Sequence, residues 1–242
     1  MRLRLLMPTS RNIINLTTPS VNARCDFCDE FTGGTLNAFS ILYGDSIASR
    51  VILSSDNFNV IPTIGQIVEG YVLIVPKLHV RSFADLPAGL RPELNYVLEV
   101  IRSASRVGYG TCVKFEHGAR TDSSGGCGVS HAHLHLVPVA SSNDPIDAIK
   151  RNNDFEIIET FDQVFEASSG FPYLYYEDTH SKKYLFKTEH IPSQYVRQLL
   201  ARKLGCKSWD WRSAKRETRL LRTIAQYSTL IKNQSRTHES CS

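Results

Sequence analysis

The side chains best suited to catalysis or metal binding lie in the run His131-Ala132-His133-Leu134-His135. If this run is a β-strand, its three histidines share one face at a spacing of roughly 6.5 to 7 Å, because successive side chains alternate between faces. Ala132 and Leu134 then point into a core. Three imidazoles on one face form a concentrated set of bases, nucleophiles and metal ligands near neutral pH.

A glycine-rich loop, Gly125-Gly126-Cys127-Gly128, comes directly before the histidine run. Glycines let the backbone approach a phosphate closely and leave N–H groups free to bind its oxygens. This loop favours chemistry on a phosphate. Two alternatives stay open: histidines with a purely structural or surface role, and a triad that only binds a metal ion.

Three ordered motifs resemble those of the histidine triad family: the histidine run, the segment Gly70–His79 with its Pro-Lys-x-His end, and Cys25-Asp26-Phe27-Cys28. The resemblance covers roughly residues 22–140. It implies an α+β fold in which an antiparallel sheet carries a flanking helix.

The resemblance also implies roles for the histidines. His133 would attack the α-phosphorus of a nucleotide and form a covalent nucleotidyl-imidazole, and His135 would line the phosphate site. In zinc-containing members of the family the four ligand positions correspond to Cys25, Cys28, His79 and His131. Four protein ligands close a tetrahedral site, so this zinc would be structural. By themselves, the two cysteines could equally be a redox pair or free thiols.

Further candidate substrate contacts depart in part from the family pattern. Gly126 and Gly128 belong to the phosphate loop, where Gly128 replaces a residue with a hydroxyl or amide. Glu116 falls near a position that often holds a substrate-binding asparagine, and Thr63 near one that often holds a ribose-binding acid. Lys77 is expected to be solvated. These departures affect the substrate more than the chemistry.

The order of predicted elements indicates an irregular lead-in (1–22), a catalytic domain (23–150) and a mixed α/β C-terminal extension (151–242). Strands are expected at Ser49–Ser54, Asn57–Pro62, Tyr71–Val75, Thr111–Phe115 and Val129–Val139, and a helix begins near Asp85. Within the extension we expect strands at Asp154–Phe161 and Tyr173–Tyr176, and helices at Ser193–Leu204 and Ala214–Ile231.

The extension is rich in aromatic and polar side chains that could pack onto the catalytic domain. A second interpretation is a lid that brings Gln194 or Arg197 to the pocket. Its last predicted helix is basic and is expected to be a solvated face.

Composition sets outer limits on function. The net charge of +4 suits an anionic small substrate and is low for a dedicated nucleic-acid binder. The N-terminus lacks the apolar core of a signal peptide, and no apolar run approaches the roughly 20 residues of a membrane span, so we expect a cytoplasmic protein without membrane contact.

The sequence therefore predicts a nucleotide hydrolase that cleaves a dinucleoside polyphosphate, a nucleoside phosphoramidate or a similar linkage. The alternatives are a nucleotidyltransferase or phosphorylase that uses the same intermediate, and a nucleotide- or nucleic-acid-binding adaptor. A histidine at position 135 favours the hydrolase-like branches, since related uridylyltransferases commonly have glutamine there. The resemblance implies a homodimer.

Overall fold

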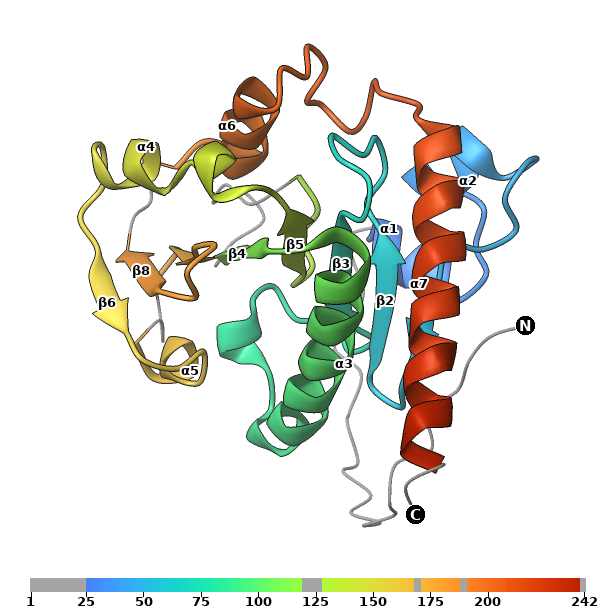
Figure 1. Cartoon of the computed structure of the whole chain (residues 1–242), viewed down its shortest axis with the longest axis horizontal. Coiled ribbons are helices and arrows are strands. Elements are labelled where there is room, and N and C mark those ends of the chain that lie inside the picture. The colour runs from blue at the N-terminus through green and yellow to red at the C-terminus, as the bar shows by residue number, and fades with distance from the viewer. Residues whose placement is uncertain (1–24, 119–127, 168–170, 188–190, 240–242) are drawn as a thin grey trace.

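A computed structural model describes residues 25–118, 128–167, 171–187 and 191–239 (Figure 1). The predicted lead-in (1–22) and most of the glycine loop lie outside these residues. The described strands are β1 (Leu53–Ser54), β2 (Phe58–Pro62), β3 (Val72–Pro76), β4 (Cys112–Gly118), β5 (Leu134–Pro138), β6 (Glu156–Ile158), β7 (Tyr173–Glu177) and β8 (Lys183–Lys187). The described α-helices are α1 (Asp26–Phe31), α2 (Ala38–Tyr43), α3 (Arg91–Tyr109), α4 (Ile146–Lys150), α5 (Gln163–Ala167), α6 (Tyr195–Lys203) and α7 (Glu217–Glu239).

All of these strands form one eight-stranded antiparallel sheet in the order β1-β2-β3-β5-β4-β7-β8-β6. The α+β class and the antiparallel sheet with a flanking helix are thus confirmed. Strands β7, β8 and β6 come from the predicted extension and continue the sheet beyond β4. The extension therefore shares the sheet of the catalytic region.

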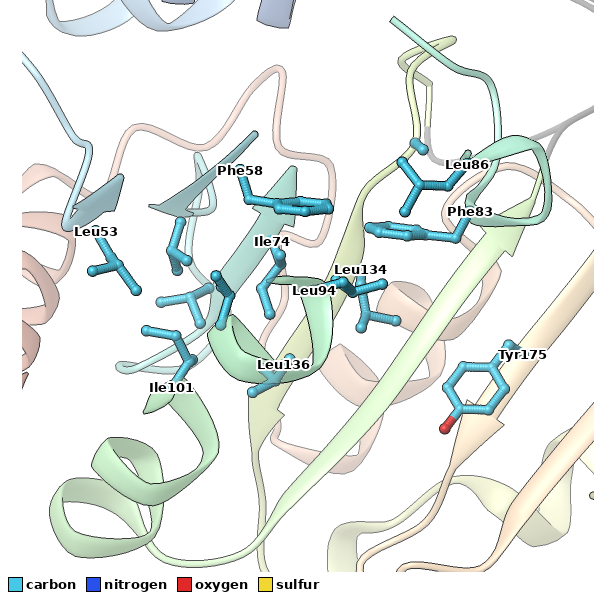
Figure 2. Close-up of a cluster of buried hydrophobic side chains, with 14 of the residues drawn as sticks. Leu53, Phe58, Ile74, Phe83, Leu86, Leu94, Ile101, Leu134, Leu136 and Tyr175 are labelled. Carbon is cyan, nitrogen blue, oxygen red and sulfur yellow. The ribbon is translucent and has the colours of Figure 1, made fainter. Parts of the chain in front are cut away.

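Helices cover both faces of the sheet. On one face α3 and α7 lie side by side, and Leu94 and Ile101 of α3 pack over Ile74, Leu134 and Leu136 of the strands (Figure 2). On the other face α1, α4 and α6 cover a second cluster that includes Leu73, Phe115 and Leu174. This alternation follows from the period of two in each strand, because neighbouring apolar residues of β3, β5 and β7 belong to opposite clusters.

Several predicted bounds change in the structure. The strand expected at Val129–Val139 begins only at Leu134, because residues before it leave the ladder and Ala132 N–H donates to the Val80 carbonyl at 2.7 Å. The strand expected at Ser49–Ser54 is reduced to β1. The helix expected from Ala214 begins at Glu217, and four elements were not predicted: α2, α4, α5 and β8.

The basic helix α7 is only partly a solvated face. Tyr227 and Ile231 are buried against α3 and the sheet. Arg219 donates to the carbonyls of Gln66 and Ile67 at 2.9 and 2.8 Å, so one of its charges holds a loop of the catalytic region. Within the described residues, no helix has both the length and the hydropathy that a membrane span requires.

Candidate functional site

The three histidines lie on the segment that leads into β5. Ala132, Leu134 and Leu136 fill the core beneath α3, so the alternating imidazoles emerge on the opposite side of the sheet. The rings of His133 and His135 are 4.7 Å apart, and both side chains are buried. Phe27 of α1 contacts the rings of both His131 and His133 edge-on, which holds this helix against the segment.

His133 has a hydrogen bond that fixes its tautomer. Its Nδ1 lies 2.6 Å from the carbonyl oxygen of His131, and a carbonyl only accepts, so Nδ1 carries the proton and donates. Burial lowers the pKa of His133 to about 4, so the ring is neutral at pH 7. Nε2 of His133 therefore has a lone pair, as a nucleophile requires.

His135 is held between two aromatic side chains. Its ring stacks on Phe115 at 4.1 Å between centroids, with an interplanar angle of 8°. The hydroxyl of Tyr71 forms a 2.6 Å hydrogen bond with Nδ1. Nε2 is buried and has no hydrogen-bond partner among the described residues. Burial, followed by the neighbouring His133, holds the pKa of His135 well below its ordinary value.

A cavity of about 510 Å³, partly open to solvent, lies over these rings. His133, His135 and Leu73 line its sheet side. Helices α1 and α2 supply one wall with the side chains of Asp26, Phe27, Glu30, Ala38 and Phe39. Thr63 and Ile64, together with Gln194, Arg197 and Trp211 from the C-terminal region, supply another.

A buried ion pair closes the α1–α2 end of the cavity. Arg50 donates through Nε and Nη2 to the two carboxylate oxygens of Glu30 at 2.8 and 2.7 Å. Its Nη1 donates to the carbonyl of Pro62 at 2.7 Å, and its guanidinium lies 5.1 Å from the ring of Phe39. This bidentate pair fixes the distance between α1 and the end of β2.

The C-terminal region contributes two buried polar side chains to the cavity. Arg197 donates to the Thr63 hydroxyl at 3.4 Å, to the Ile64 carbonyl at 3.3 Å and to the Gly65 carbonyl, and lies over the ring of Tyr71. Gln194 adopts a left-handed backbone conformation (φ 58°) before α6. Its Nε2 donates to Asp210 at 3.3 Å, whereas its buried Oε1 has no partner among the described residues.

The four predicted metal ligands come together beside this cavity. One ligand atom from each of Cys25, Cys28, His79 and His131 lies within 4.8 Å of the others. The Nδ1 atom of His131 is 3.3 and 3.6 Å from the two sulfurs, and that of His79 is 3.4 Å from Cys28 Sγ. Tetrahedral zinc, with bonds of about 2.3 Å to sulfur and 2.0 to 2.1 Å to nitrogen, would separate S and N by about 3.5 Å. The donor set and its spacing thus fit zinc.

Neighbouring contacts orient the His131 ring and shift the pKa values of the two cysteines. The second ring nitrogen of His131 donates to the carbonyl of Pro76 at 2.8 Å, which directs Nδ1 towards the sulfurs. A hydrogen bond from the Cys28 thiol lowers the pKa of Cys25, and the same bond raises the pKa of Cys28. The pair therefore forms one thiolate readily, and the thiolate is the form that binds metal.

Glu116, Gly128 and Lys77 do not line this cavity. Glu116 points to the opposite side of β4 from Phe115, where its carboxylate accepts from Phe83 N–H at 2.7 Å and from the Tyr173 hydroxyl at 2.5 Å. Gly128 is exposed and its carbonyl accepts from Arg212 at 3.3 Å, while Gly126 lies outside the described residues. The ammonium of Lys77 donates to the carbonyl of Ser55.

Sequence reasoning did not identify Tyr71, Arg50 or Glu30 as parts of the site. For Tyr71 the available signal is its parity with Leu73 and Val75, which assigns it to the same face of the sheet as His135. Glu30 lies two residues after Cys28 in α1, so the zinc motif already indicated this helix. Arg50 carries no local signal, because its partner is twenty residues away.

Known proteins resemble the part of the chain that carries this site. Residues 45–141, which contain the three histidines, match the HIT domain family. No curated protein matches the chain. One similar solved structure is a Zn-bound histidine triad family protein from Mycobacterium smegmatis, with 25% identity and a TM-score of 0.34 over 48% of this chain and 75% of that one. Another is a hypothetical histidine triad nucleotide-binding protein from Sulfolobus tokodaii, with 13% identity and a TM-score of 0.36 over 75% and 92%.

Proposed function

Because the match of residues 45–141 to the HIT domain makes the chain a member of the histidine triad family, we propose that it cleaves a nucleoside phosphate linkage through a covalent nucleotidyl-His133 intermediate. The observation that carries this proposal is the hydrogen bond from His133 Nδ1 to the His131 carbonyl. It leaves the lone pair of a neutral imidazole on a ring that lines the cavity.

The reaction has two balanced steps. His133 Nε2 attacks the α-phosphorus, a P–N bond forms, and the bond from phosphorus to the leaving group breaks as that group takes a proton from solvent. Water then attacks the same phosphorus and releases a proton to solvent, the P–N bond breaks, and a nucleoside monophosphate leaves while the imidazole regains its lone pair. Dividing one displacement into two is the usual benefit of a covalent intermediate.

Two side chains of the cavity suit the charge that develops on the phosphoryl oxygens. His135 lines the cavity and its Nε2 has no partner among the described residues. Arg197 brings a permanent positive charge to the wall of the cavity, close enough to lower the pKa of His135. Preorganised donors of this kind contribute about 10²- to 10³-fold each to the rate in related chemistry.

The rest of the cavity suits a nucleoside. Phe39, Ile64 and Trp211 provide apolar and aromatic surface for a base, which stacks well on such groups. Thr63 and the amide oxygen of Gln194 are polar groups within reach of ribose hydroxyls or base amino groups. Gly126 and Gly128 remain proposed phosphate contacts, and Glu116 is left out of the pocket because it faces the other side of the sheet.

A zinc ion held by Cys25, Cys28, His79 and His131 would have a structural role, since four protein ligands leave no open position. When bound, it would join α1 to the segment that carries His133. The cytoplasmic location stays a prediction from the sequence.

The decisive experiment incubates the protein with dinucleoside polyphosphates and nucleoside phosphoramidates and follows nucleoside monophosphate release. Samples quenched in alkaline denaturant, where the P–N bond of a nucleotidyl-histidine is stable, are examined by peptide mass spectrometry for a nucleotidyl group on His133. We expect turnover and the adduct in wild type, and neither in His133→Ala. His180→Ala, which alters an exposed histidine in a turn, is the matched control and should behave as wild type. Absence of both turnover and adduct with every substrate would refute the proposal.

A second arm separates hydrolysis from its alternatives. With inorganic phosphate as acceptor, a nucleoside diphosphate product would indicate phosphorolysis through the same intermediate. Binding to oligonucleotides without turnover, weakened steeply by added salt, would instead favour the adaptor.

A further inference from the structure

Two neighbouring imidazoles in the site have hydrogen bonds of opposite kind. The Nδ1 atom of His133 faces a carbonyl, which can only accept. The Nδ1 atom of His135 faces the phenolic hydroxyl of Tyr71 at 2.6 Å, and a phenol can donate. A neutral imidazole has one N–H and one lone pair, so the partner at Nδ1 decides what Nε2 offers.

The chemistry of the Tyr71–His135 pair selects a direction. A phenol titrates near pH 10 and is a much stronger acid than the N–H of a neutral imidazole. The favoured arrangement is therefore Tyr71 O–H donating to the lone pair on His135 Nδ1. The proton of His135 then lies on Nε2, the buried atom that has no partner among the described residues.

The surroundings keep both rings in place. Tyr71 is fully buried, and its backbone carbonyl accepts from Thr63 N–H at 3.1 Å and from Gln66 Nε2 at 3.0 Å. The guanidinium of Arg197 lies 5.5 Å from the centre of its ring. His135 stacks on Phe115, so a flip of the imidazole about its axis would break the hydrogen bond to Tyr71.

We infer that Tyr71 is a positioning residue that holds His135 in the Nε2–H tautomer, so that the site presents a lone pair on His133 and a hydrogen-bond donor on His135. The catalytic consequence rests on the proposed function: the nucleophile, His133, and the donor to the phosphoryl oxygens, His135, are both histidines and differ in their tautomer. The opposite direction of the bond would put lone pairs on Nε2 of both rings, and two acceptors would repel the phosphate oxygens that must enter.

The tautomers can be measured without a substrate. Long-range proton–nitrogen NMR spectra of the full chain with ¹⁵N-labelled histidine distinguish Nδ1–H from Nε2–H rings. The signals of the two histidines are assigned by their loss in His133→Ala and His135→Ala. We expect the Nδ1–H form for His133 and the Nε2–H form for His135. An Nδ1–H form for His135 in wild type would overturn the inference.

Tyr71→Phe removes only the hydroxyl and is the second test. In this variant His135 should become a mixture of tautomers, while His133 stays Nδ1–H. Tyr227→Phe is the matched control: it also removes a buried hydroxyl, one that donates to the Gly70 carbonyl at 3.1 Å, and it should leave both tautomers unchanged. An unchanged His135 in Tyr71→Phe would also overturn the inference.

Activity supplies a separate readout. If wild type turns over, kcat of Tyr71→Phe should fall by about 10- to 100-fold with a smaller change in KM, the usual size of effect when a group that orients a working histidine is lost. Tyr227→Phe should retain kcat. If wild type shows no turnover with any substrate, the proposed function fails, while the NMR result still decides the role of Tyr71.

Discussion

The buried carboxyl of Glu116 leads to a prediction about how the stability of the protein depends on pH. The carboxyl is buried between Phe83 N–H and the Tyr173 hydroxyl, on the face of β4 opposite His135. Burial raises the pKa of Glu116 from an ordinary value of 4.5 to about 8, although both hydrogen bonds favour the ionised form. The folded protein therefore keeps this carboxyl protonated at pH values where the unfolded chain has lost the proton.

The sign and size of the effect on stability follow from this difference. Below about pH 4.5 Glu116 is protonated in both the folded and the unfolded state, and its ionisation takes nothing from the free energy of unfolding. Between about pH 4.5 and 8 only the unfolded state releases the proton, so the free energy of unfolding falls by about 1.4 kcal/mol per pH unit. Above pH 8 the loss levels off at about 5 kcal/mol.

The perturbation is Glu116→Gln, which keeps the shape and cannot ionise. Urea unfolding of wild type and variant at constant ionic strength gives the free energy of unfolding at each pH. At pH 4 the two proteins should agree within about 1 kcal/mol, since both carry a neutral side chain there. By pH 9 the variant should have gained about 5 kcal/mol relative to wild type. Parallel curves across this range would refute the reasoning.

Three other predictions concern the parts that frame the cavity. Arg50→Met should lower the free energy of unfolding by about 3 to 5 kcal/mol in denaturant titrations, because it leaves the Glu30 carboxylate buried without its partner, and adding Glu30→Gln should recover part of the loss. Removal of metal by a chelator should lower Tm reversibly, and Cys28→Ser should reduce bound zinc, measured by elemental analysis, to below about half an equivalent. Light scattering should give a monomer rather than the homodimer that the family resemblance implies. Strand β7 of the same chain already pairs with β4, so β4 is not an edge that a second chain could join. The strands at the two edges of the sheet, β1 and β6, are too short to pair strongly with another chain. A dimer mass at micromolar concentration would contradict this last expectation.

The sequence predicts the positions of the three histidines and the four metal ligands well because their motifs are local. The alternation of His131, His133 and His135 requires only a strand-like backbone, and the Cys-x-x-Cys pair requires only a turn into a short helix. The fourth ligand, His79, follows a buried apolar strand, so its position relative to β5 could be inferred from family order. These groups meet in the structure as the resemblance implied.

Residues that depend on register could not be placed in the same way. Tyr71 reaches His135 because β3 and β5 pair with Leu73 opposite His135, and no local pattern specifies that pairing. Glu116 illustrates the converse. Its place in the linear order suggested a substrate contact, but the alternation of Val113 and Phe115 on the cavity side assigns it to the core side.

The extension resisted prediction for a different reason. Strand β8 is short and has a lysine at each end, so it has little apolar signal of its own. It becomes a strand because β7 and β6 pair on both of its sides. Its stability is therefore tertiary in origin, which a single sequence does not reveal.

The cavity wall supplied by Gln194, Arg197 and Trp211 has a consequence for how the protein is made. Synthesis runs from the N-terminus, and regions generally fold in that order. A nascent chain that has released only the HIT domain already carries His133, but none of these three side chains faces it. The cavity is therefore completed late in translation, and a chain cut short after residue 150 would keep His133 and lack the wall that these three side chains supply.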